Sequence, residues 1–181
     1  MKSVPILFLT LALAACSSAP PPAPRVLDLG IAAPAATLPG VSIASVRAAA
    51  PFDGVEMHYR LAWRNSSELL PFANSLWAAA PPELLRKQLL RASREGVGKC
   101  VLEVEIQEFT QVFSAKEASE ARIELRGVLA GKSGRFAARV WSVVEPNAGA
   151  DAVSGATAFA RAADRVVAEL GGWITAQSEC R

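Results

Sequence analysis

Cys16 stands at a position where a thiol could become a membrane anchor. The tripeptide Leu-Ala-Ala precedes it directly, which is the pattern known as a lipobox. The upstream residues include one lysine and then an apolar run over residues 6–13, far shorter than the ~20 residues that cross a bilayer. We therefore predict that residues 1–15 are a lipoprotein signal peptide and that the Cys16 thiol receives a diacylglycerol. An ordinary secretory signal with an incidental cysteine is the alternative.

Cys100 and Cys180 are the other two cysteines of the chain. An even pair in an oxidising compartment favours one disulfide, with two free thiols as the alternative. Cys100 opens a predicted strand, and Cys180 ends the last predicted helix. We predict a disulfide between them, which would fasten the C-terminus to the sheet and close a loop of 80 residues (180 − 100).

His58 is the only histidine, so a Ser-His-Asp system would have to use it. It lies in a strand pattern and is interpreted as a surface or packing residue. No Gly-x-Ser-x-Gly elbow or clustered His and Cys ligands accompany it, and the sequence 131–134 lacks the glycine spacing of a phosphate-binding loop. We predict a protein that is not an enzyme and that uses no metal and no cofactor.

The charge of the mature chain is nearly balanced. Loss of Lys2 with the signal leaves 18 basic side chains (19 − 1) against 17 acidic ones. This balance argues against nucleic acid as a partner.

Five aromatic residues crowd positions 52–77, a segment predicted to be partly irregular. Aromatic side chains in loops often mark interfaces, although they also dominate cores. The alternative is therefore a loop folded over the sheet with its aromatic side chains buried. We predict partner contact through Phe52, Tyr59, Trp63, Phe72 and Trp77.

The rest of the chain reads as a tether followed by one domain. Proline and alanine dominate residues 17–24 and continue beyond them, which predicts an extended tether over residues 16–40. Residues 41–181 then form a single periplasmic domain. Alternating apolar residues predict strands at 41–46, 55–63, 100–113 (with a bulge before Phe109), 121–129 and 135–144, and a short strand could form at 25–29.

Two helices complete the expected fold. One begins at Pro81 and stops at the glycines 96 and 98, and residues 65–80 before it are expected to be irregular. The other begins at a cap, Asp151 or Ser154, and buries one apolar face. Mixed charges on its polar face disfavour the alternative of a lipid-binding helix. The expected class is α+β, a mainly antiparallel sheet of about five strands with two helices packed on one face.

The order of these features resembles the ABC-type transport auxiliary lipoproteins, the PqiC-like family. The resemblance covers roughly residues 25–175 in addition to the lipobox, and Phe52 departs from the Tyr-Leu that is usual there. The features that carry it are Pro51-Phe52-Asp53-Gly54, Tyr59-Arg60, Asn74-Ser75-Leu76-Trp77-Ala78, Pro81-Pro82 with the Leu-rich helix, Glu105 with Glu108-Phe109, and Gly172-Trp173-Ile174.

The resemblance implies a non-enzymatic partner of MCE-domain proteins and of an inner-membrane ABC transporter, in a system that moves lipids between envelope membranes. Its membrane contact would be the lipid anchor, and a homo-oligomer would suit ring-forming MCE partners. Ser17, in place of aspartate, favours the outer membrane, facing the periplasm, over the inner membrane. The alternatives are an envelope scaffolding lipoprotein that binds a cell-wall enzyme or outer-membrane protein, and an anchored hydrolase that uses His58.

Overall fold

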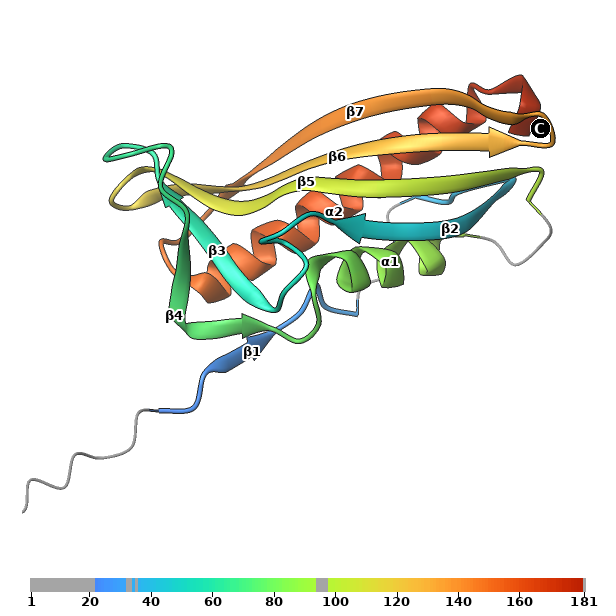
Figure 1. The fold of residues 1–181 in the computed structure, drawn as a ribbon. Helices are drawn as coiled ribbons and strands as arrows, with labels where there is room; N and C mark the ends of the chain where they lie inside the picture. Colours follow the sequence, from blue (N-terminus) through green and yellow to red (C-terminus); the bar gives the residue numbers. More distant parts are fainter. Residues whose placement is uncertain (1–21, 32–33, 35, 94–97, 181) are drawn as a thin grey trace, which may run out of the picture.

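The structure, a computed structural model, describes residues 22–31, 34, 36–93 and 98–180 (Figure 1). Cys16 and the predicted signal peptide lie outside these residues. Within the described part, the chain forms seven strands, two α-helices and one 3-10 helix. In chain order they are β1 (Arg25–Leu27), β2 (Val41–Ala48), β3 (Glu56–Leu61), β4 (Leu70–Trp77), α1 (Pro81–Ala92), β5 (Cys100–Ala115), β6 (Ala118–Gly131), β7 (Gly134–Asn147), α2 (Ala152–Thr175) and η1 (Ser178–Cys180).

The long strand β5 is the centre of the sheet. One of its edges pairs with β6, which runs antiparallel to it and pairs in turn with β7. Its other edge is shared between two strands that run parallel to it, β2 along the first half and β3 along the second. β4 is antiparallel to β3, and β1 is parallel to β4, so the sheet is mixed (Figure 1).

The prediction of a mainly antiparallel sheet of about five strands is wrong, because seven strands of both orientations are present in the described residues. Alternation identifies a strand but does not say which strand will be its neighbour. β2 and β3 reach β5 only through a long connection that contains α1, and such crossovers place strands in parallel. β4 lies at residues that were expected to be irregular, because its centre, Ala-Asn-Ser, carries no apolar alternation.

A β-bulge divides β5 where its neighbour changes. The register with β6 shifts between Ile106 and Glu108, which confirms the predicted bulge before Phe109. Even-numbered residues such as Leu102 and Ile106 are buried before the bulge, and Phe109 is buried after it. The bulge therefore keeps one face of β5 apolar while the strand passes from β2 to β3.

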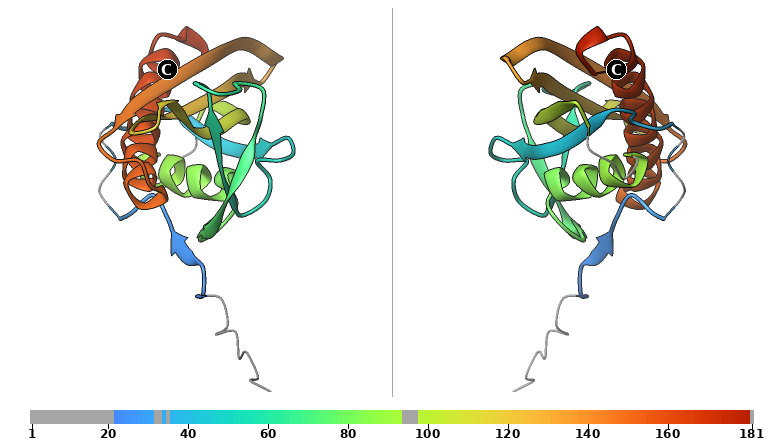
Figure 2. Two further views of the ribbon diagram at one scale, coloured as in Figure 1. Left: turned by 90° about the vertical axis from the view of Figure 1, so that its left-hand side faces the viewer. Right: turned by 90° about the vertical axis from the view of Figure 1, so that its right-hand side faces the viewer.

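Both helices lie on one face of the sheet (Figure 2). α2 packs on β6 and β7, while α1 packs on β2 and contacts α2. α2 begins where Asp151 Oδ1 accepts hydrogen bonds from the backbone N–H groups of Val153 (2.8 Å) and Ser154 (2.9 Å), so Asp151 is the cap. These bonds, led by that of Ser154, hold the pKa of Asp151 below its usual value. Neither helix is long and apolar enough for a membrane crossing, in the part of the chain that the structure describes.

The folded part begins upstream of the expected boundary at residue 40. β1 pairs with β4, and Leu29 and Leu38 belong to the hydrophobic core. The backbone N–H of Leu38 also donates to the carbonyl of Ala92 at the end of α1 (2.9 Å). A tether can therefore lie only ahead of β1, and not over the whole of residues 16–40.

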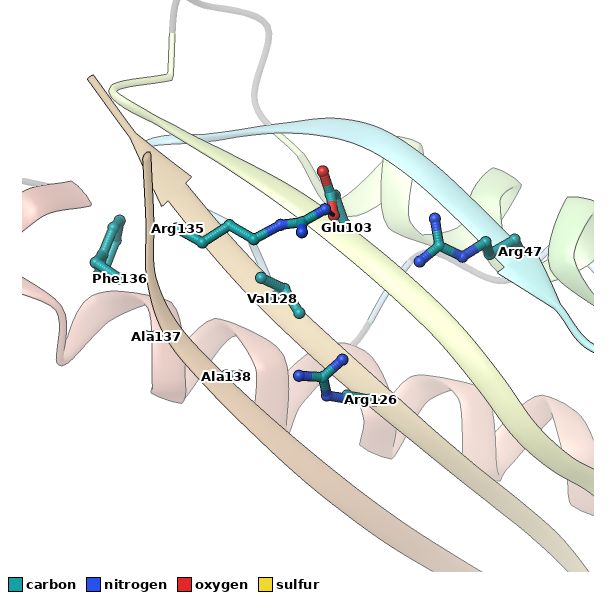
Figure 3. Close-up of a pocket in the computed structure, with 8 residues that line it drawn as sticks. All are labelled: Arg47, Glu103, Arg126, Val128, Arg135, Phe136, Ala137 and Ala138. Carbon is teal, nitrogen blue, oxygen red and sulfur yellow. Dashed lines mark hydrogen bonds and ion pairs between the residues drawn. The ribbon is translucent and has the colours of Figure 1, made fainter. Parts of the chain in front are cut away.

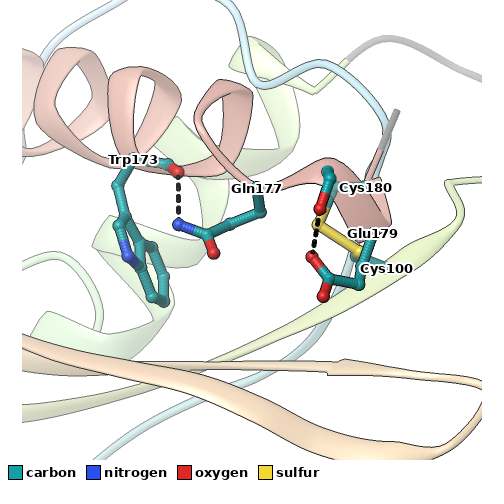
Figure 4. The surroundings of a disulfide bond; sticks show 6 residues. Cys100, Trp173, Gln177, Glu179 and Cys180 are labelled. Atoms are coloured by element: carbon teal, nitrogen blue, oxygen red, sulfur yellow. Dashed lines mark hydrogen bonds between the residues drawn. A yellow bond between two sulfur atoms is a disulfide. The ribbon is translucent and has the colours of Figure 1, made fainter.

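A disulfide joins Cys100 to Cys180, which confirms the predicted pairing (Figure 4). Their Cα atoms are 5.1 Å apart, and Cys180 lies in η1, beyond the end of α2. Gly40 packs against this end of the chain with a φ of +66°, and a Cβ there would meet the carbonyl oxygen of Cys180. Only glycine allows both the positive φ and this close approach.

Candidate functional site

The five aromatic residues predicted to contact a partner fall into two groups. Trp77 and Phe52 are only 2% and 5% exposed and belong to the core. Trp63 is 46% exposed, and Tyr59 and Phe72 are partly buried. Only the second group is therefore accessible at the surface of the folded domain.

Trp77 lies at the edge of a buried aromatic cluster that also contains Phe109 and Phe159. The rings of Phe109 and Phe159 stack with their centroids 4.4 Å apart, and the Trp77 ring meets them edge-on at 5.5 Å and 5.3 Å. Such edge-to-face contacts are favourable beyond the area they bury. The cluster ties β4 to β5 and α2, so the role of Trp77 in this fold is packing.

The accessible group surrounds an open pocket of about 310 Å³. The centroid of the Tyr59 ring lies 4.6 Å from that of Phe72 and 5.9 Å from that of Phe113. These three rings, which come from β3, β4 and β5, form the floor of the pocket. We call this feature the aromatic pocket. Its lining residues are Tyr59, Leu61, Trp63, Phe72, Ala73, Phe113, Lys116 and Ala150.

An ion pair on the side of β3 opposite the pocket holds this strand, and with it the pocket, in position. Side chains alternate along a strand, so Tyr59 and Arg60 point to different faces. Arg60 donates from Nε and Nη2 to the two carboxylate oxygens of Glu108, both at 3.1 Å, and this pair is mostly buried. The bidentate bond locks β3 against the bulge of β5. The backbone N–H of Trp63 then donates to the carbonyl of Phe113 (3.4 Å) and holds the loop at the rim.

His58 is a packing residue, which is one of the two roles, surface or packing, expected from its strand pattern. It is nearly buried, and the ring of Phe52 meets it edge-on at 5.9 Å. Burial lowers its pKa, since the charged form loses hydration, and Nδ1 has no hydrogen-bond partner among the described residues. Residues 22–31, 34, 36–93 and 98–180 also contain no group of three or more His, Cys, Asp or Glu side chains placed to hold a metal ion.

A second hollow, of about 290 Å³, lies on the sheet face that the helices leave open (Figure 3). Arg135 pairs with Glu103 at 2.7 Å, and Arg47 pairs with Glu105 at 3.3 Å. Alternation along β5 places these glutamates on the face opposite the buried residues, but nothing in the sequence indicates their arginine partners, which come from other strands. Exposed pairs of this kind contribute little to stability. Each pair neutralises one glutamate of β5, and Arg126 lines the same hollow.

The fold and the pocket define an α+β domain with one mixed sheet, covered by helices on a single face and holding an open aromatic pocket where β3, β4 and β5 meet. Solved structures share this architecture. A protein of Xanthomonas campestris, described as a member of DUF330, superposes with a TM-score of 0.66 at 23% sequence identity, over 83% of this chain and 92% of that one. An uncharacterized protein superposes with a TM-score of 0.65 at 13% identity, over 84% of this chain and 99% of that one.

These likenesses show a common fold. No family model matches the sequence, and no curated protein matches it.

Proposed function

We propose that this protein is a membrane-anchored, non-enzymatic lipoprotein that docks a partner protein through the aromatic pocket. The observation that supports this most directly is the exposed Trp63 beside Tyr59 and Phe72, on a domain whose first strand begins nine residues after the lipobox cysteine (25 − 16). Exposed aromatic side chains over a preformed hollow are typical anchors for a partner.

The chemistry of the pocket limits what it can hold. Its walls are aromatic and aliphatic, and Lys116 is its single charged lining residue. A matching protein segment presents one apolar side chain to the hollow and a carboxylate to Lys116. Such a contact combines an apolar anchor with a charge at the solvated rim.

The resemblance to the PqiC-like family supports a more specific role. In that role the partner is an MCE-domain protein of an ABC-type lipid transport system, and the anchor holds the domain to the outer membrane, facing the periplasm. The shared fold of the DUF330 protein is compatible with the resemblance and adds no partner.

Replacing Cys16 by serine is expected to release the protein from membranes, because serine has no thiol for a thioether to diacylglycerol. The measurement is fractionation of cells that express the full chain, followed by immunoblotting of membrane and soluble fractions. The matched control is Ser18→Ala, which changes a residue close to the cleavage position and keeps the Cys16 thiol. Equal recovery of wild type and Cys16→Ser in membranes would contradict lipid anchoring.

Replacing Trp63 by alanine is expected to weaken partner binding about thirtyfold, the loss of a typical hot spot. Because Trp63 is half exposed, the free energy of unfolding should change by no more than about 1 kcal/mol. Co-purification from detergent-solubilised membranes with an MCE-domain protein of the same cells measures the effect. Phe136→Ala, an exposed aromatic residue at the hollow on the open sheet face, is the control and should bind normally. Unchanged binding by Trp63→Ala would place the contact elsewhere.

A further inference from the structure

The described chain begins on the side of the domain that carries β1 and α1 (Figures 1 and 2). The segment after β1 runs along α1, because Gln88 Nε2 donates to the carbonyl of Leu29 and Arg91 Nη1 to that of Gly30, both at 3.4 Å. Arg25 is nine residues further along the chain than Cys16 (25 − 16), so the two lie no more than about 30 Å apart. An anchor at Cys16 therefore keeps β1 within that distance of the bilayer.

The outward surface of α1 carries two cations and one carboxylate around an exposed leucine. The buried residues of the helix share one side, which includes Leu85 and Leu89. By the helical period, Leu90 and Glu83 lie at the centre of the opposite side, with Arg86 and Lys87 flanking them. Leu90 is 43% exposed, and neither cation forms an ion pair among the described residues. Glu83 precedes Arg86 by three residues and Lys87 by four, so this side of the helix carries two basic side chains and one acidic one.

The start of the domain adds exposed aliphatic side chains. Val26, in β1, is 64% exposed, while the side chain of its neighbour Arg25 points to the other face of the strand and lines a hollow with Asp151. Ile31, next to Gly30 in the segment that runs along α1, is 89% exposed. Cations interspersed with exposed aliphatic side chains match the headgroup region of an anionic bilayer, which attracts the charge and accepts the apolar tips. We call these residues the α1–β1 face: Val26, Ile31, Glu83, Arg86, Lys87 and Leu90.

We propose that the α1–β1 face lies on the anionic phospholipid surface of the membrane that holds the anchor. The inference rests on the proposed lipid anchoring, which brings this face close to the bilayer. The sheet face that carries Arg135 and Glu103 lies on the side away from the helices and so points away from the membrane. The anchor and the α1–β1 face together fix the orientation in which the domain meets a partner.

The test uses the mature chain from residue 16 with Cys16→Ser, which carries no lipid, so its result does not depend on anchoring. Co-sedimentation is measured with vesicles of phosphatidylcholine alone and of phosphatidylcholine mixed with phosphatidylglycerol. We expect binding to the anionic vesicles only, weakened by salt. The double variant Arg86→Glu/Lys87→Glu should bind them at least about tenfold more weakly, because each basic residue near an anionic surface contributes substantially to adsorption.

A matched double variant, Lys132→Glu/Arg135→Glu, changes the net charge equally in the β6–β7 hairpin and should bind like the parent. Equal loss in both variants would mean that net charge alone acts and would overturn the assignment of the face. Absence of binding to anionic vesicles would also overturn it. Normal vesicle binding by Arg86→Glu/Lys87→Glu with loss of a co-purifying protein would identify the face as a protein interface instead. Failure of the anchor itself is detected separately, by the fractionation of Cys16→Ser.

Discussion

Replacing both Cys100 and Cys180 by serine is expected to lower the free energy of unfolding by about 4 to 5 kcal/mol, the value of the chain-entropy model for a closed loop of this size. The bond spans 80 residues and joins the start of β5 to the turn after α2. Without the disulfide, the unfolded chain can adopt conformations that the closed loop excludes, so its entropy is higher. Both cysteines are buried, so the native structure gains little hydration in exchange. Urea denaturation of the oxidised wild type and of the variant measures the difference.

A loss of this size is a large share of the ~5–15 kcal/mol that typically stabilises a domain. The wild type treated with a reductant is the matched control, and it should approach the stability of the double variant. Complete alkylation of the mature chain without a reductant would show that the bond does not form. Equal stability of variant and wild type would show that the bond forms without stabilising the fold.

The second half of the chain was predictable because its signals are local. β5, β6 and β7 follow one another with short turns, so alternation and turn residues are enough to give both the strands and their antiparallel order. The positive φ of Gly134, where β7 begins, is what a hairpin glycine provides. Asp151 begins α2 by binding N–H groups two and three residues away. The disulfide could be predicted without any knowledge of the fold, because two thiols in an oxidising compartment have only each other as partners.

In the first half, the strands β2 and β3 and the start of α1 were predicted, but the pairing of the strands was not, because their partners are distant in sequence. β2 pairs with residues 100–106, and β3 pairs with residues that begin at Thr110, on the same edge of one strand. Neither pairing can be recognised from the residues of β2 or β3 alone. β1 has three residues, too few to alternate, and its place is set by pairing with β4. The tether was therefore predicted too long, because pairing and burial place Arg25, Leu29 and Leu38 in the domain.

The aromatic site shows the same limit at the level of side chains. Composition predicted that the residues from 52 to 77 would include surface aromatics, and Trp63 is such a residue. The partners of Trp77 are Phe109 and Phe159, which follow it by 32 residues (109 − 77) and 82 residues (159 − 77). No pattern within the segment distinguishes the two tryptophans. The distinction depends on the bulge in β5 and on the packing of α2.

Replacing Trp77 by alanine is expected to lower the free energy of unfolding by about 3 to 5 kcal/mol, the range for truncating a large aromatic side chain in a core. The cavity would open beside the stacked rings of Phe109 and Phe159 and separate β4 from α2. Trp77 Nε1 has no hydrogen-bond partner among the described residues, so Trp77→Phe removes no hydrogen bond there and should cost about 1 to 2 kcal/mol. Urea denaturation of the two variants measures both losses.

The comparison with Trp63→Ala separates the two roles that the sequence alone could not distinguish. Trp63→Ala should keep the stability of the wild type and lose the partner, because its ring stands at the rim of the aromatic pocket. Trp77→Phe should keep the partner at temperatures where it is folded, because its ring reaches no surface. If Trp77→Ala instead unfolds like the wild type but fails to co-purify with the partner, then β4 must open when the partner binds, and the buried cluster would belong to the interface.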